Sequence, residues 1–191
     1  MYKKECIVVN LIGGPGVGKS ILTSDVFSQL KRKFVSAEIS PEYIKKKIRE
    51  KSMKAVQSQI YIFGKQQYQQ FTMKDDVDVI VTDSPFILSS IYDTSKCTLL
   101  KALILQEFNK YDNLTYYIER DDKIPYEQEG RFQDASGAVK VDNSVVDFLD
   151  KNAIEYKSVR GIGKDSLDYI VNDVMSSLKA KDGKREREES K

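Results

Sequence analysis

Eight consecutive residues near the N-terminus combine glycines, a lysine and a serine at a spacing that can bind phosphate. They match the pattern G-x-x-x-x-G-K-[ST] and are Gly13, Gly14, Pro15, Gly16, Val17, Gly18, Lys19 and Ser20. Glycines let successive backbone N–H groups turn towards one phosphate, Lys19 adds a positive charge, and the Ser20 hydroxyl can ligate Mg²⁺. The pattern therefore predicts a P-loop that binds ATP, and we place the next residue, Ile21, in the same nucleotide site.

Asp83 is a second candidate because it follows residues 77–82, an apolar segment that is typical of a buried strand. A carboxylate at the end of such a strand can hold Mg²⁺ directly or through water. Alternatively, Asp83 caps the next helix, helped by Pro85. Ser84 follows it in place of a second acid. The sequence thus lacks the paired acid that activates water in motor-type ATPases.

Three further charged residues could act on a transferred phosphoryl group or on its acceptor. Glu42 follows a predicted second strand, which in the simplest layout runs close to the first, so its carboxylate could orient or deprotonate an acceptor hydroxyl. The alternative is an ordinary acid in a first helical turn. Arg120 and Arg131 could neutralise the phosphoryl group, or they are solvated surface charges.

The order of the predicted elements indicates an α/β fold. Apolar, β-branched runs predict strands at residues 6–12, 34–40, 77–82, 114–118 and 154–159. Helical spacing of apolar residues predicts helices at 19–33, 55–71, 99–108, 142–152 and 167–178. This alternation predicts a P-loop kinase-like three-layer sandwich, with a five-stranded parallel sheet and helices on both faces. Ligands bind at the carboxyl ends of such strands, where the glycine-rich segment, Glu42 and Asp83 all fall.

Two segments fall outside this alternation. Residues 120–140 are polar, contain Gly and Pro and lack periodicity, which predicts a mobile loop or lid. From residue 179 the sequence is highly charged and lacks apolar residues that could pack, which predicts a disordered tail. We therefore expect a single domain over residues 1–178, with a lid at about 120–140 and a charged tail at 179–191.

The composition excludes several classes of chemistry. The chain has 191 residues and no histidine, so a Ser-His-Asp hydrolase and histidine-ligated metals are excluded. Cys6 and Cys97 are too few for a disulfide framework. The net charge of +2 does not demand nucleic acid, and no apolar run reaches the roughly 20 residues that cross a bilayer. We expect a cytoplasmic monomer or homodimer with no membrane partner.

A GTPase is the first nucleotide-binding class to test, because residues 109–112 read N-K-x-D, as in a guanine-reading motif. In GTPases that motif follows an apolar strand. Here it ends a predicted helix and precedes the predicted strand at 114–118. We interpret these residues as a helix-terminating turn, which argues against a GTPase.

Several segments in order give the chain a resemblance to a known family. They are GGPGVGKS, SPEYIKK, QSQIYIFGKQQY, VDVIVTDSPFILSSIY, YYIER, and PYEQEGRFQ followed by VD. Over residues 5 to about 160 the chain resembles the NadR/ribosylnicotinamide-kinase-like P-loop family, whose AAA-type ATPase or kinase members are often phage-encoded. The resemblance implies a five-stranded P-loop kinase core and ATP-dependent phosphorylation of a nucleoside-like acceptor. Ser40 and Pro41 depart from the family pattern, which leaves the acceptor open.

The resemblance also implies roles for individual residues. Glu42 corresponds to the acidic residue after the second strand, beside Tyr43 on the substrate side, and Asp83 to the aspartate at the strand end. Three residues fall in the substrate-side helix, namely Gln59, Lys65 and Gln66. The lid would contribute Arg120, Arg131 and Gln133, and the loop that packs on adenine would contain Arg160 and Gly161.

The charge of the substrate-side helix bears weakly on the acceptor. A mononucleotide usually requires arginine on this side, whereas residues 57–71 offer amides, phenols and only Lys65. This composition fits a neutral sugar and base, unless the face is merely solvated. Our leading hypothesis is a Mg·ATP-dependent kinase of a nucleoside-like or nucleotide acceptor. The alternatives are a phage kinase acting on a modified base or hydroxyl in DNA, which the net charge does not favour, and a nucleotide-binding NTPase or switch protein without acceptor turnover.

Overall fold

The structure is a computed structural model, and it describes residues 6–121 and 135–189. Side chains are described over residues 6–121 and 137–183. Arg131 and Gln133, two residues of the predicted lid, lie outside the described residues. No helix within the described ranges is long and apolar enough to cross a membrane.

Five parallel strands form one sheet, as the sequence predicts. They are β1 (Ile7–Ile12), β2 (Ala37–Ser40), β3 (Val79–Thr82), β4 (Asp112–Glu119) and β5 (Lys157–Arg160), and their spatial order is β2-β3-β1-β4-β5. In this order β3 lies between β1 and β2, with Val9 and Ile39 both paired with Val81. The expectation that the second strand runs close to the first is therefore wrong, and the end of β3 lies between the segments that follow β1 and β2.

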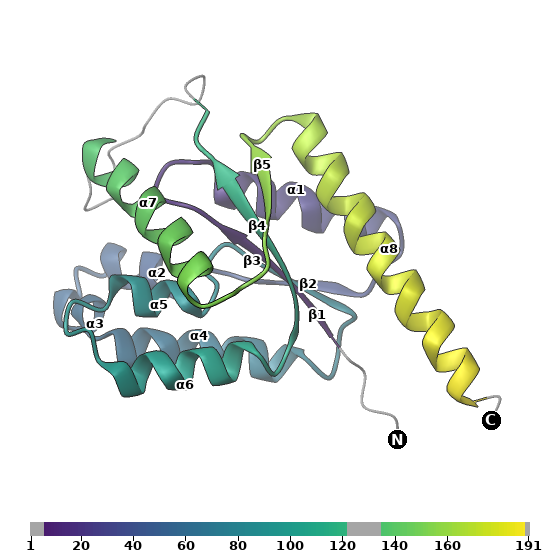
Figure 1. Cartoon of the computed structure of the whole chain (residues 1–191), viewed down its shortest axis with the longest axis horizontal. Helices are drawn as coiled ribbons and strands as arrows, with labels where there is room; N and C mark the ends of the chain where they lie inside the picture. The colour runs from purple at the N-terminus through teal and green to yellow at the C-terminus, as the bar shows by residue number, and fades with distance from the viewer. Residues whose placement is uncertain (1–5, 122–134, 190–191) are drawn as a thin grey trace.

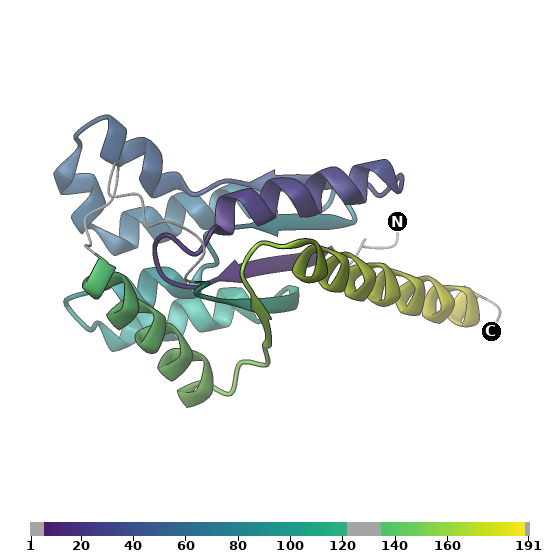
Figure 2. The same ribbon diagram turned by 90° about the horizontal axis from the view of Figure 1, so that it is seen from above.

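Helices cover both faces of the sheet (Figure 1). Their bounds are α1 (Lys19–Arg32), α2 (Tyr43–Arg49), α3 (Met53–Gln57), α4 (Gln59–Met73), α5 (Ile87–Tyr92), α6 (Thr98–Phe108), α7 (Ala135–Lys151) and α8 (Lys164–Glu189). α1 and α8 pack on one face, whereas α4, α5, α6 and α7 pack on the other. Viewed from above, α2, α3 and the start of α7 lie near the end at which β1 points, on either side of the β1–α1 loop (Figure 2). The three-layer α/β sandwich is thus confirmed.

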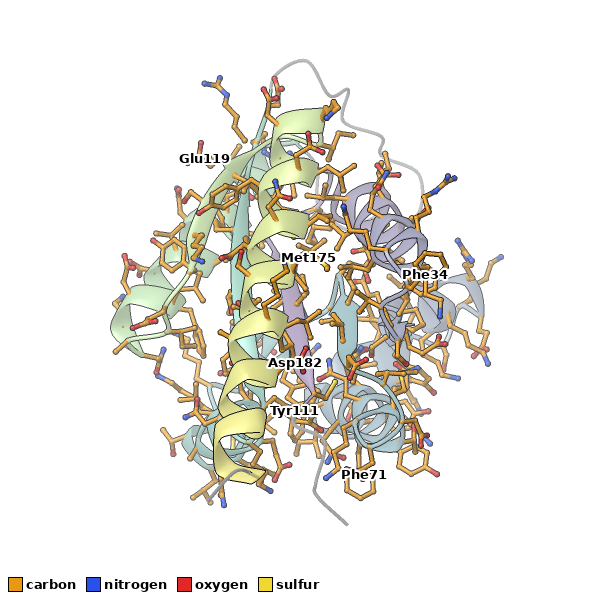
Figure 3. The ribbon with its side chains drawn as sticks, turned by 90° about the vertical axis from the view of Figure 1, so that its right-hand side faces the viewer. Phe34, Phe71, Tyr111, Glu119, Met175 and Asp182 are labelled. Atoms are coloured by element: carbon orange, nitrogen blue, oxygen red, sulfur yellow. The ribbon has the colours of Figure 1, made fainter. Side chains whose placement is uncertain are left out.

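The core follows from the two-residue period of the strands. In β1, Ile7, Val9 and Leu11 face α1 and α8, while Ile12 belongs to the opposite cluster with α5, α6 and α7. Met175 of α8 packs against the first cluster, and α8 runs along that face of the sheet (Figure 3). Full burial of one such aliphatic side chain stabilises the fold by about 1.5–3 kcal/mol, so this core fixes the strand ends that position the site.

Two local predictions need correction. The helix expected over 55–71 is two helices, because the Ser58 hydroxyl accepts a hydrogen bond from the Tyr61 N–H at 3.4 Å and caps α4. The segment expected to be a lid up to residue 140 is already helical from Ala135. Ala138, which precedes the predicted helix start at residue 142, is fully buried and supports this earlier start.

The charged C-terminal segment also differs from the prediction. α8 continues to Glu189, so residues 179–189 are helical instead of disordered. Lys, Glu and Arg have favourable helix propensities, and Lys181 forms an ion pair of 2.7 Å with Asp112 at the start of β4. This contact joins the last helix to the sheet. The N-K-x-D segment runs from the residue after α6 to Asp112, the first residue of β4, which agrees with its interpretation as a helix-terminating turn.

Candidate functional site

The P-loop connects the end of β1 to the start of α1. Gly16 and Gly18 have φ values of 84° and 86°, a left-handed region in which other residues are strained. A Cβ atom on Gly18 would also lie 2.4 Å from Cγ2 of Ile162, which follows β5. The loop therefore curves at its glycines while the β5–α8 connection packs against it.

Lys19 lies within this curve. Its Nζ donates hydrogen bonds to the carbonyl oxygens of Gly13 and Gly14 at 2.8 and 2.7 Å. Burial of the ammonium lowers the pKa of Lys19 to about 8, although the carboxylates of Glu42 and Asp83 oppose that shift. Lys19 is thus a cation that the protein's own groups stabilise poorly and that a phosphate would stabilise well.

Ser20 and Asp83 meet beside the P-loop. The Ser20 hydroxyl donates a hydrogen bond of 2.6 Å to Oδ2 of Asp83, whose side chain is almost fully buried. If Asp83 capped the next helix, that helix would begin at residue 84. α5 instead begins at Ile87 with Phe86 in the N-cap position, so this alternative is wrong. One hydroxyl and one carboxylate are hard oxygen ligands, of the kind that hold Mg²⁺ together with water and nucleotide phosphates. Within the described residues, no three or more His, Cys, Asp or Glu side chains gather in a group that could hold a metal ion.

Lys45, which the sequence analysis did not identify, connects Glu42 to Ser20 and Asp83. Nζ of Lys45 lies 2.9 Å from Oε2 of Glu42, 3.1 Å from Oδ2 of Asp83 and 2.6 Å from Oγ of Ser20. Burial acts to lower the pKa of Lys45, but the neighbouring carboxylates of Glu42 and Asp83 outweigh it and the net shift is upwards. The helical i,i+3 spacing of Glu42 and Lys45 was the one signal for this contact in the sequence.

Arg120 contacts the P-loop together with Asp142, the acidic residue of the V-D pair quoted for the resemblance, to which the sequence analysis assigned no role. Its Nε donates to Oδ2 of Asp142 at 2.8 Å, and its Nη2 donates to the Pro15 carbonyl at 2.9 Å. Oδ1 of the same Asp142 accepts the Gly14 N–H at 2.7 Å. Asp142 therefore ties α7 to both β4 and the P-loop, a long-range contact that no local motif encodes.

The predicted acceptor-side residues have unequal environments. Gln66 is buried: its amide nitrogen donates to Oγ of Ser40 at 2.9 Å, and its oxygen accepts the Tyr43 N–H at 3.2 Å. It therefore holds the β2–α2 connection that carries Glu42. The Tyr43 hydroxyl lies 2.6 Å from that of Tyr61.

Gln59 and Lys65 complete the acceptor-side set. Gln59 is also buried and donates to the Val56 carbonyl at 3.3 Å, whereas Lys65 is exposed with its Nζ 5.8 Å from the centroid of the Tyr61 ring. The two glutamines are thus buried and hydrogen-bonded within the chain, whereas Lys65 and Tyr61 face solvent.

The remaining nucleotide-site predictions fall around the P-loop. Val17 is buried in the core, and Ile21 is 53% exposed in the first turn of α1. Arg160 is exposed at the end of β5. Gly161 is buried with a φ of 65°, and its N–H bonds the Glu119 carbonyl at 3.2 Å. This arrangement places the β5–α8 connection beside the P-loop.

The fold and this geometry define a P-loop α/β protein with one P-loop lysine and a serine–aspartate pair. A family model described as an AAA domain matches residues 8–165, and the chain belongs to that family. No curated protein matches the sequence.

Two solved structures resemble the chain in fold. Deoxyadenosine kinase from M. mycoides with bound dATP has a TM-score of 0.54 and 14% identity, over 90% of this chain and 99% of that one. The same enzyme with the products dCMP and a flexible dCDP has a TM-score of 0.56 and 15% identity, over 91% and 99%. At this identity the likeness establishes the shared fold.

Proposed function

We propose that the protein is a Mg·ATP-dependent phosphotransferase that phosphorylates a hydroxyl of a nucleoside-like acceptor. One observation carries the proposal: the Glu42 carboxylate and the Ser20–Asp83 pair converge on a single position next to the P-loop. Phosphoryl transfer needs a metal at the phosphates and an acid near the acceptor hydroxyl, and this arrangement supplies candidates for both.

Each residue has a defined task in this proposal. The P-loop amides and Lys19 bind the phosphates, and Ser20 with Asp83 would hold Mg²⁺, which when bound neutralises developing charge on the phosphates. Glu42 orients or deprotonates the acceptor hydroxyl. Arg120 is engaged by Asp142 and the Pro15 carbonyl, so we assign it a positioning role at the P-loop.

The acceptor side supports a neutral ligand. Tyr43 and Tyr61 present paired hydroxyls, and the cations that lie over their rings are lysines, with Nζ of Lys47 5.5 Å from the Tyr43 centroid and Nζ of Lys65 5.8 Å from the Tyr61 centroid. A dianionic mononucleotide is usually held by arginine, which forms paired hydrogen bonds with phosphate. The fold shared with a deoxyadenosine kinase agrees with a nucleoside-like acceptor.

Transfer of label from γ-labelled ATP tests the proposal. The protein is incubated with Mg²⁺ and, in separate reactions, with nucleosides, nicotinamide riboside, mononucleotides or DNA, and the Lys19→Met variant is the control. The proposal is supported if the wild-type protein forms a labelled nucleoside product and the Lys19→Met variant does not. Label on DNA would support the DNA kinase instead, and tight ATP binding without labelled product in any reaction would support a switch protein.

A further inference from the structure

The ammonium of Lys45 lies where a divalent cation would contact the protein. Its three nearest acceptors are oxygens of Ser20, Asp83 and Glu42, at 2.6, 3.1 and 2.9 Å. An ammonium group has three donors and no acceptor, so these three oxygens can satisfy it completely. Two of the oxygens belong to the residues assigned above to Mg²⁺.

The two sides of this contact differ in how firmly the fold holds them. The Asp83 side chain is 7% exposed, whereas that of Lys45 is 44% exposed. None of the residues of α2, which carries Lys45, is buried. Asp83 is therefore held by the core, and Ser20 is held by the first turn of α1 and by its hydrogen bond to Asp83. The lysine, in contrast, can leave by rotating its side chain, without loss of core packing.

We propose, building on the function proposed above, that Lys45 is an internal counter-ion that occupies the metal position in the nucleotide-free protein and is displaced by Mg²⁺. An ammonium and a divalent cation repel each other at this separation, so they cannot share the oxygens of Ser20 and Asp83. Displacement also breaks the Lys45–Glu42 ion pair. Metal loading and release of the Glu42 carboxylate towards the acceptor are thereby linked through one side chain.

Binding of Mn²⁺ in the absence of nucleotide tests this proposal. Electron paramagnetic resonance measures the free Mn²⁺ that remains after titration into the wild-type protein and the Lys45→Met variant. Removal of the competing charge is expected to tighten Mn²⁺ binding at least about tenfold. The matched control is Lys46→Met, which removes the same charge from the next, exposed residue of α2 and is expected to change binding by less than about twofold.

Two further variants make the outcome unambiguous. Lys45→Gln should tighten binding as Lys45→Met does, and addition of Asp83→Asn to Lys45→Met should abolish the gain. The proposal is overturned if both Lys45 variants, folded by circular dichroism, bind Mn²⁺ no more tightly than Lys46→Met. The measurement requires neither acceptor nor turnover. A tenfold gain in a protein that transfers no phosphoryl group would therefore support the counter-ion and refute only the kinase activity.

Discussion

Asp142 and Gly14 are 128 positions apart, yet the Asp142 carboxylate accepts the Gly14 N–H at 2.7 Å. A Cβ atom on Gly14 would lie 2.3 Å from Oδ1 of Asp142, so the glycine is also required for this approach. The other carboxylate oxygen holds Arg120. Through Asp142, α7 thus fixes the position of the P-loop backbone at Gly14.

The Asp142→Ala variant is expected to be less stable than the wild-type protein and to bind ATP more weakly. The substitution removes the carboxylate that accepts hydrogen bonds from the Gly14 N–H and the Arg120 guanidinium. Because this position is nearly buried, the loss lowers the free energy of unfolding by about 2–4 kcal/mol. ATP affinity falls because the P-loop amides lose their fixed direction. Urea unfolding and calorimetric titration with ATP measure the two effects.

Asp147→Ala is the matched control for this prediction. Asp147 also lies on α7 and pairs with Lys151, but both side chains are largely exposed. Exposed pairs of this kind contribute little to stability, so the variant should resemble the wild-type protein in both measurements. If the two variants had the same stability and the same ATP affinity, Asp142 would have no role in positioning the P-loop.

Lys19→Met should separate nucleotide binding from folding. The variant loses a charge-assisted phosphate contact, which corresponds to a loss of about 10- to 100-fold in ATP affinity. Its thermal stability without ATP should not fall, because burial already disfavours the Lys19 ammonium. Differential scanning fluorimetry without ATP checks the second expectation, and a folded variant with unchanged ATP affinity would contradict the P-loop assignment.

The pKa of Lys19 predicts a pH dependence of ATP binding. With a pKa of about 8 in the free protein, Lys19 is mostly neutral above pH 8, whereas bound phosphates favour the ammonium and raise the pKa. ATP binding should therefore take up a proton above pH 8, and affinity should fall as the pH rises further. Calorimetry at pH 8.5 in two buffers with different ionisation enthalpies measures the uptake. The Lys19→Met variant should show none.

Local signals in the sequence were sufficient to predict the P-loop and most strands. Residues 13–20 match a specific phosphate-binding pattern between a strand and a helix, and β1 is apolar except for Asn10. Asp83 was found because it ends such a run. These features depend on neighbouring residues, so no tertiary information was needed.

The remaining features depend on contacts between distant segments. The position of β3 between β1 and β2 is set by packing of the whole sheet, and this order explains how Glu42 approaches Asp83 although β2 is not adjacent to β1. Asp142 belongs to the V-D pair quoted for the resemblance, but its role could not be predicted because its partners Gly14 and Arg120 lie in other elements. Lys45 was likewise one of many charges in the lysine-rich segment after Glu42.

Glu42→Gln distinguishes a kinase from a nucleotide switch most directly. The substitution keeps the size of the side chain but removes the charge that would accept the proton of the acceptor hydroxyl. ATP affinity should change little, because the P-loop, Ser20 and Asp83 make the contacts to nucleotide and metal. Phosphoryl transfer should fall by roughly 10²- to 10⁴-fold, nearer the lower limit because a loose transition state needs less help from a base.

Glu50→Gln provides the matched control, since Glu50 follows the same helix and pairs with Lys47 at i,i+3, as Glu42 does with Lys45. Both variants remove one carboxylate from one ion pair of α2, but only Glu42 adjoins the Ser20–Asp83 pair through its lysine. Single-turnover transfer and ATP affinity, measured on the same preparations, should therefore show a defect in transfer for Glu42→Gln alone. Equal transfer rates in the two variants would mean that Glu42 is an ordinary acid at a helix start. The proposal that Glu42 contacts the acceptor hydroxyl would then have to be abandoned.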